Sequence, residues 1–95
     1  MANAYVIGHI TIKDPDKWSQ YRDRVPATLQ PWRGELVFRG KLVAVLGGEF
    51  AHNDTVVIRF PDMDAVNGWF DSAAYQSLIP LRLAAADVDL LAYDG

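Results

Sequence analysis

The chain contains no cysteine, and this absence excludes a disulfide scaffold, thiolate metal ligands and thiol catalysis. Basic residues are also few: nine Lys and Arg against twelve Asp and Glu give a net charge of -3, which argues against binding to nucleic acid. The longest apolar stretch, residues 4–12, is interrupted by Gly8, His9 and Thr11 and follows no basic segment. We therefore expect neither a signal peptide nor a membrane span, and the expected location is the cytoplasm.

The motifs of several reaction classes are missing as well. The sequence has no glycine-rich phosphate loop, no Gly-x-Ser-x-Gly elbow and no His-Glu-x-x-His pattern. Two histidines without carboxylates at ligand spacing predict no metal site, and no pattern indicates a bound cofactor. Proton transfer in an apolar pocket is the reaction class that these residues permit without a cofactor.

Apolar residues are plentiful for so short a chain. Of the 95 residues, 51% are hydrophobic and 12% aromatic, which rules out disorder and predicts one folded domain over residues 1–95. Residues 5–12 alternate as a strand does, with Gly8 and Ile10 on an apolar face and His9 on a mixed one.

The remaining elements follow from periodicity, caps and turn residues. A helix is expected from Pro15, capped by Asp14, kinked or broken at Pro26 and ended by Pro31 and Gly34. Its buried stripe comprises Trp18, Tyr21, Val25, Leu29 and Trp32, and its solvent side Lys17, Arg22, Asp23 and Arg24. We expect strands at 35–38 and 42–46 joined by a tight turn at 39–41, and a further strand at 55–60. A helix at 63–71 capped by Asp62 should follow, and then a helical segment at 73–86 capped by Ser72 with a kink at Pro80. The last expected element is a strand at 88–93.

The order β-α-β-β-α-(α)-β is typical of the α+β class and predicts a ferredoxin-like plait, an antiparallel sheet with helices on one face. The other face is expected to carry Tyr5, Ile7, Val43, Val45, Val57, Leu91 and Tyr93. Such a face is too apolar for water, so we expect a second copy of the chain to cover it and form a homodimer.

Several short motifs carry a resemblance to a known family. They are Ala4-Tyr5-Val6-Ile7, Asp14-Pro15, Val25-Pro26, Arg39-Gly40, Phe60-Pro61, Trp69-Phe70-Asp71-Ser72, Tyr75-Gln76 and Leu81-Arg82. Together they resemble the family catalogued as domain of unknown function 1330, over nearly the whole chain. The resemblance implies a dimeric α/β barrel, whose relatives by fold include cofactor-free monooxygenases, muconolactone isomerases and haem-binding chlorite dismutases. It implies no particular reaction, because the family has none assigned.

Candidate site residues fall on the third helical segment and beside it. Tyr75 and Arg82 are seven residues apart and share one helical face, so we expect both to point toward one cavity, with Arg39 or His9 at its rim. They would hold a carboxylate or phenolate ligand; the alternative for the arginines is ion pairing within the molecule or across a dimer. For Arg59 the alternatives are also ligand binding and an ion pair within the molecule or across a dimer, with Glu35 among the candidate partners.

Aromatic residues such as Tyr21 and Trp69 would line a pocket for an aromatic compound, or else simply pack the core. His9 or Tyr75 would handle protons in an enzyme; the alternative for His9 is a hydrogen bond within the dimer interface, and His52 is expected to be solvated. Three functions follow: a binding protein for a small aromatic or carboxylate ligand, a cofactor-free monooxygenase or isomerase, and a structural dimer module without a ligand.

Overall fold

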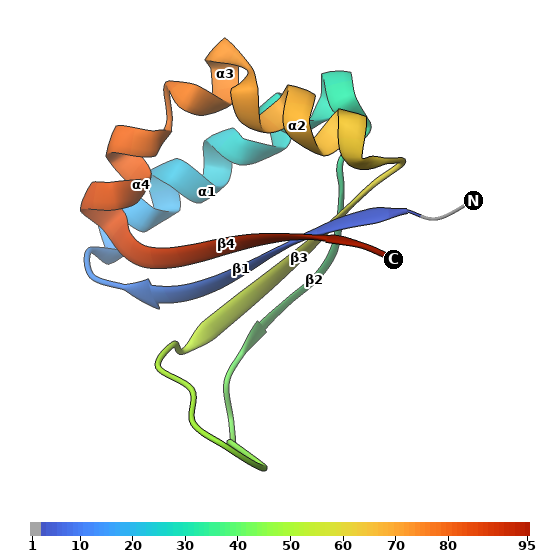
Figure 1. Ribbon diagram of the computed structural model, residues 1–95. Coiled ribbons are helices and arrows are strands. Elements are labelled where there is room, and N and C mark those ends of the chain that lie inside the picture. The colour runs from blue at the N-terminus through green and yellow to red at the C-terminus, as the bar shows by residue number, and fades with distance from the viewer. Residues whose placement is uncertain (1–2) are drawn as a thin grey trace.

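The computed structural model describes residues 3–95, which form a four-stranded antiparallel sheet with all helices on one face (Figure 1). The strands are β1 (Ala4–Ile12), β2 (Glu35–Lys41), β3 (Asp54–Phe60) and β4 (Ala86–Asp94), in the sheet order β2-β3-β1-β4. The helices are α1 (Pro15–Leu29), α2 (Met63–Asp71), α3 (Ala73–Gln76) and α4 (Ile79–Ala85), and a 3-10 turn, η1 (Gln30–Trp32), follows α1. The predicted ferredoxin-like α+β fold is confirmed.

The predicted turn at residues 39–41 is wrong, because β2 runs straight through it. Arg39, Gly40 and Lys41 pair with Val56, Thr55 and Asp54 of β3. Residues 42–53 form a loop below the sheet instead of the predicted strand at 42–46 (Figure 1). The pairing of β2 with β3 ends at Lys41 opposite Asp54, where β3 begins, so residues 42–46 lie beyond the end of their partner strand despite their β propensity.

The helix starts match the prediction, and the breaks do not. Asp14 accepts a hydrogen bond from the backbone N–H of Lys17, and Asp62 accepts one from that of Ala65, so both predicted caps are confirmed. The predicted break at Pro26 is wrong, because α1 continues through it to Leu29. The predicted single segment at 73–86 is also wrong: it is two short helices, and Pro80 lies in the first turn of the second, where a missing N–H is tolerated.

The core lies between the helices and the sheet. Its largest fully buried side chains are Trp69, Tyr75 and Phe60, and the Trp69 ring packs 4.2 Å from the Tyr75 ring and 5.5 Å from the Phe60 ring. Along β1 the predicted alternation holds, with Val6 and Ile10 buried against the helices. No helix among residues 3–95 is long and apolar enough to cross a membrane.

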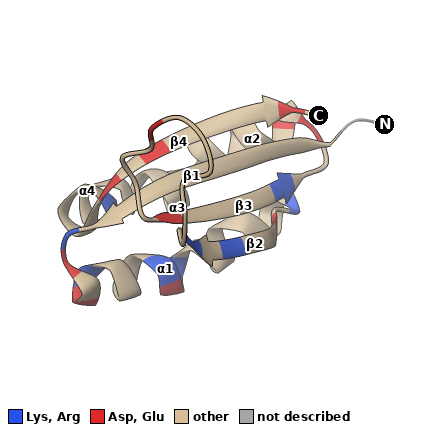
Figure 2. Cartoon of the chain, turned by 90° about the horizontal axis from the view of Figure 1, so that it is seen from below, with Lys and Arg blue, Asp and Glu red and all other residues tan. Residues whose placement is uncertain are grey.

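The opposite face of the sheet carries no helix (Figure 2). Across its centre the register places Phe38, Val57, Ile7 and Leu91 side by side. Arg59 pairs with Glu35 at 2.7 Å on the neighbouring strand, the intramolecular alternative that the sequence left open for it. Val43 and Val45, predicted for this face, lie in the loop at residues 42–53 instead.

Candidate ligand-binding site

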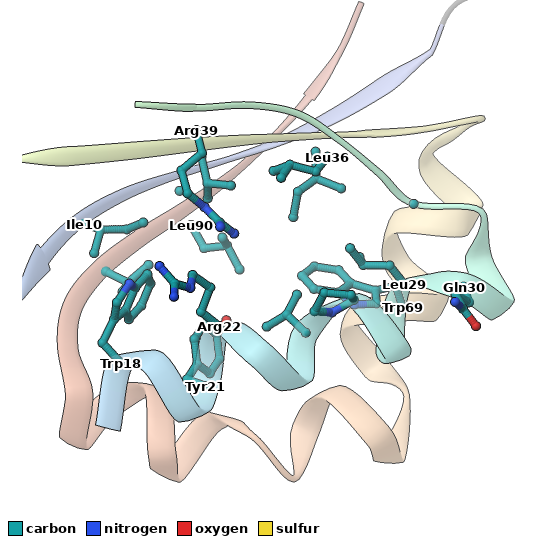
Figure 3. Close-up of a pocket in the computed structure, with 17 residues that line it drawn as sticks. Ile10, Trp18, Tyr21, Arg22, Leu29, Gln30, Leu36, Arg39, Trp69 and Leu90 are labelled. Carbon is teal, nitrogen blue, oxygen red and sulfur yellow. The ribbon is translucent and has the colours of Figure 1, made fainter. Parts of the chain in front are cut away.

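A cavity of about 290 Å³ lies between α1 and the helix-facing side of the sheet (Figure 3). That volume is at the small end of known ligand sites, which span about 300–1,000 Å³. Gly8 lies in the cavity wall, and a side-chain carbon placed there would sit 3.0 Å from the Val56 side chain. The absence of a side chain at this position therefore leaves space between the strand and the helix.

The cavity walls are mainly apolar and aromatic. They include Ile10, Trp18, Val25, Leu29, Leu36, Ile58, Trp69, Val88 and Leu90. The indole N–H of Trp69 donates to the Thr28 hydroxyl at 2.9 Å, and that hydroxyl donates to the Val25 carbonyl at 2.7 Å. These two bonds satisfy the polar atom of a buried Trp69, so its ring is held in a fixed orientation in the wall.

Two guanidinium groups point into one end of this apolar space, Arg22 from α1 and Arg39 from β2 (Figure 3). Arg39 forms no salt bridge and no side-chain hydrogen bond with any of residues 3–95. Arg22 has only a loose contact, in which its Nε lies 3.9 Å from Oδ1 of Asp23. Burial and, secondly, the positive charge of Arg22 lower the pKa of Arg39, while Asp23 opposes this shift. The end of the cavity is thus positively charged and incompletely neutralised.

A hydrogen-bonded chain runs from the cavity wall into the helical layer. Tyr21 lines the cavity, and its hydroxyl lies 2.9 Å from the hydroxyl of Tyr75. Nη1 of Arg82 donates to the Tyr75 hydroxyl at 2.8 Å, and the Nε of Arg82 is buried without a partner among residues 3–95. Burial raises the pKa of Tyr21 far above its ordinary value, and the charge and hydrogen bond of the neighbouring Tyr75 raise it further, so Tyr21 stays protonated.

The structure brings together three of the predicted site residues directly. Arg39, Tyr21 and Trp69 line the cavity. Tyr75 lies in α3 and Arg82 in α4, so they do not share one helical face, although they contact each other. The expectation that both point into the cavity is wrong, because neither lines its wall; they connect to it through Tyr21.

His9 lies on the other face of the sheet, away from the cavity, because β1 alternates and Gly8 already points to the helices. Its Nδ1 lies 3.4 Å from the Thr55 hydroxyl, and the Phe50 ring packs against it edge-on. The expectation that His52 is solvated is wrong, since its Nε2 lies 2.7 Å from Asp89 and its side chain is only 14% exposed. Residues 3–95 contain no group of three His, Asp or Glu side chains placed to hold a metal ion.

Sequence reasoning missed Arg22, which it placed on the solvent side of α1. A signal was present, because Trp18, Arg22, Val25 and Leu29 follow one another at intervals of four, three and four residues. That spacing puts Arg22 on the apolar stripe itself. Thr28, which holds Trp69 across 41 residues of sequence, had no local signal.

Comparisons with known proteins identify the fold and give no established activity. Residues 3–95 match the profile of a family described as Domain of unknown function (DUF1330), and no curated protein matches the chain. A protein of unknown function from Rhodopseudomonas palustris is similar over 99% of this chain and 82% of its own, with 13% identity and a TM-score of 0.84. A cofactor-independent oxygenase from Streptomyces nogalater is similar over 100% of this chain and 94% of its own, with 11% identity and a TM-score of 0.73.

A third structure is described as a dimeric ferredoxin-like protein of unknown function from Thermobifida fusca. It is similar over 99% of this chain and 92% of its own, with 12% identity and a TM-score of 0.65. At these identities the likeness shows the fold alone.

Proposed function

Because the chain belongs to the family Domain of unknown function (DUF1330), which has no assigned activity, we propose a function from its own geometry. The protein binds a small aromatic or unsaturated organic acid in the cavity between α1 and the sheet. The carboxylate lies between Arg22 and Arg39, and the apolar body lies against Trp69 and the aliphatic wall.

The observation that carries this proposal is the incompletely neutralised pair of guanidinium groups at one end of an apolar cavity. Arginine cannot lose its charge, so two of them near one another need an anion, a carboxylate partner or water. Asp23 satisfies Arg22 only loosely, and Arg39 has no carboxylate partner among residues 3–95. A carboxylate accepts such donors with charge-assisted bonds, and the apolar wall favours an acid with a hydrophobic body over a small inorganic anion.

The proposal includes a homodimer that forms through the open face of the sheet. Leu91 and Tyr93 of β4 and Phe38 of β2 remain 42%, 47% and 55% exposed on or beside this face. The loop at residues 42–53 also presents Val43 and Leu46, which are almost completely exposed. Contiguous apolar surface of this kind marks an interface, and the similar protein from Thermobifida fusca is described as dimeric.

Calorimetric titration with 2-naphthoate and with the neutral 2-naphthamide tests the ligand class. The two probes have nearly the same shape, and the acid should bind at least about tenfold more tightly, because a hydrogen bond to a charged group contributes about 1.5–3 kcal/mol. Arg39→Gln and Arg22→Gln should each remove most of that preference. Arg24→Gln, on α1 but outside the cavity wall, is the matched control and should leave it unchanged.

Equal affinity for the acid and the amide would contradict the proposal, as would an Arg39→Gln variant that behaves like Arg24→Gln. If neither probe binds at millimolar concentration, the structural dimer without a ligand becomes the better interpretation.

A further inference from the structure

We infer that Tyr21 is a hydrogen-bond donor directed at a carbonyl, enolate or phenolate oxygen of the ligand, and that Tyr75 and Arg82 set the direction of this donor. The inference deepens the proposed binding function and rests on it for the location of the site. It adds a second recognition element beside the arginines and narrows the ligand class to aromatic or unsaturated acids that carry an oxo or phenolic oxygen.

The direction follows from the protons available along the chain of three residues. Arg82 has donors only, so its bond to the Tyr75 hydroxyl uses that oxygen as an acceptor. Tyr75 is completely buried, and its own proton needs an acceptor. Among residues 3–95 its one hydrogen-bonding partner besides Arg82 is the Tyr21 oxygen at 2.9 Å. Tyr75 therefore donates to Tyr21.

Once Tyr21 accepts from Tyr75, its own proton has no acceptor among residues 3–95. Tyr21 lines the cavity, and its side chain lies at the end where Arg22 and Arg39 converge (Figure 3). A ligand oxygen in the cavity is the partner that completes the chain. The site thus offers donors from three residues at one end and no acidic side chain in its wall, so it favours oxygen atoms that only accept.

The hydrogen-bonded series from Arg82 through Tyr75 also strengthens Tyr21 as a donor. The bond from Arg82 to Tyr75 is charge-assisted, and successive hydrogen bonds polarise one another. No carboxylate of residues 3–95 forms a salt bridge with Arg82, and its Nε has no partner, so its positive charge is not neutralised within the protein. A polarised donor of this kind stabilises negative charge on a carbonyl oxygen, as an oxyanion hole does.

The test uses three probes that differ at one substituent: 2-acetonaphthone, which has a carbonyl, 2-ethylnaphthalene, which has none, and 2-naphthoate. In the wild-type protein we expect the ketone to bind about threefold to tenfold more tightly than the hydrocarbon. The C=O stretch of the bound ketone should shift to lower wavenumber than in an apolar solvent. Tyr21→Phe should abolish both the preference and the shift.

Tyr75→Phe and the double variant separate positioning from packing. Tyr75→Phe should weaken the carbonyl shift without changing the affinity for 2-ethylnaphthalene. In the Tyr21→Phe background it should change nothing further, because its effect passes through the Tyr21 hydroxyl. Tyr93→Phe, on the other sheet face, is the control and should bind all three probes like the wild type.

The outcomes distinguish this inference from the proposed function. If 2-naphthoate binds through the arginines but the carbonyl shift persists in Tyr21→Phe, the inference is overturned and the proposed function stands. If the ketone binds with a Tyr21-dependent shift and 2-naphthoate does not bind, the carboxylate assignment fails and the Tyr21 donor stands. If no probe binds, both are overturned.

Discussion

The substitution Tyr75→Phe tests the buried hydrogen-bonded chain through its effect on stability. The side chain is completely buried, and its hydroxyl takes part in two bonds, at 2.8 Å to Arg82 and at 2.9 Å to Tyr21. Removal of the oxygen keeps the ring and its packing against Trp69, so the change isolates the polar interactions.

The magnitude follows from the two bonds. A hydrogen bond to a charged group contributes about 1.5–3 kcal/mol to the free energy of unfolding, and a neutral one about 1 kcal/mol. Arg82 is only partly buried, so water replaces some of its lost bond. We therefore expect Tyr75→Phe to lower the free energy of unfolding by about 2–3 kcal/mol. For a domain of this size each kcal/mol lowers Tm by about 4–8 °C.

Urea denaturation followed by tryptophan fluorescence measures this change, at one fixed protein concentration because association raises apparent stability. Tyr93→Phe is the matched control: Tyr93 is 47% exposed and forms no side-chain hydrogen bond with residues 3–95, so its loss should cost less than about 0.5 kcal/mol. If Tyr75→Phe is as stable as Tyr93→Phe, the chain from Tyr21 to Arg82 contributes nothing and the reasoning is refuted.

Three further predictions concern charge, the open face and the caps. Because burial raises the pKa of Tyr21, the folded state holds that proton more tightly than the unfolded state. The free energy of unfolding should therefore keep its full value below the unfolded-state pKa of about 10 and decrease as the pH rises above it. Alkaline denaturation midpoints should show this decline in the wild type and less of it in Tyr21→Phe. Val57→Asp places an uncompensated charge in the centre of the open sheet face, so sedimentation should find monomer or unfolded chain. The control Lys17→Asp, on the solvent side of α1, should sediment like the wild type. Asp14→Ala and Asp62→Ala should each lower the free energy of unfolding by about 0.5–2 kcal/mol, and Asp16→Ala, which follows the first cap, by less; neutral results at both caps would mean that these side chains do not hold the helix starts.

The sequence predicted the elements that local chemistry determines. Alternation fixed the faces of β1, and the caps at Asp14 and Asp62 fixed where two helices begin. Residues 42–46 were mistaken for a strand because β propensity says nothing about where the partner strand ends. That end is set by β3, which begins at Asp54 opposite Lys41.

Of the six site residues expected from the sequence, the cavity wall contains three and lacks Tyr75, Arg82 and His9. Arg39, Tyr21 and Trp69 were named from the sequence, but the contact that links Tyr21 to Tyr75 spans 54 residues, and no local pattern indicates it. The alternation of β1 was enough to exclude His9 from the cavity. Gly8 faces the helices, so its neighbour must face the other way, and one strand cannot present both to a single cavity.

The arginines also bear on why the cavity is present at all. A packing defect in a small core would be lined by apolar side chains alone, because a guanidinium placed against an apolar wall loses hydration. In this protein two guanidinium groups enter the same space, and burial and mutual repulsion together lower the pKa of Arg39. Both side chains also reach water, since Arg39 is exposed and the Arg22 side chain is 42% exposed. A bound carboxylate would accept hydrogen bonds from both guanidinium groups and offset the repulsion between them, so two like charges facing an apolar cavity fit the proposed acid better than they fit a packing defect.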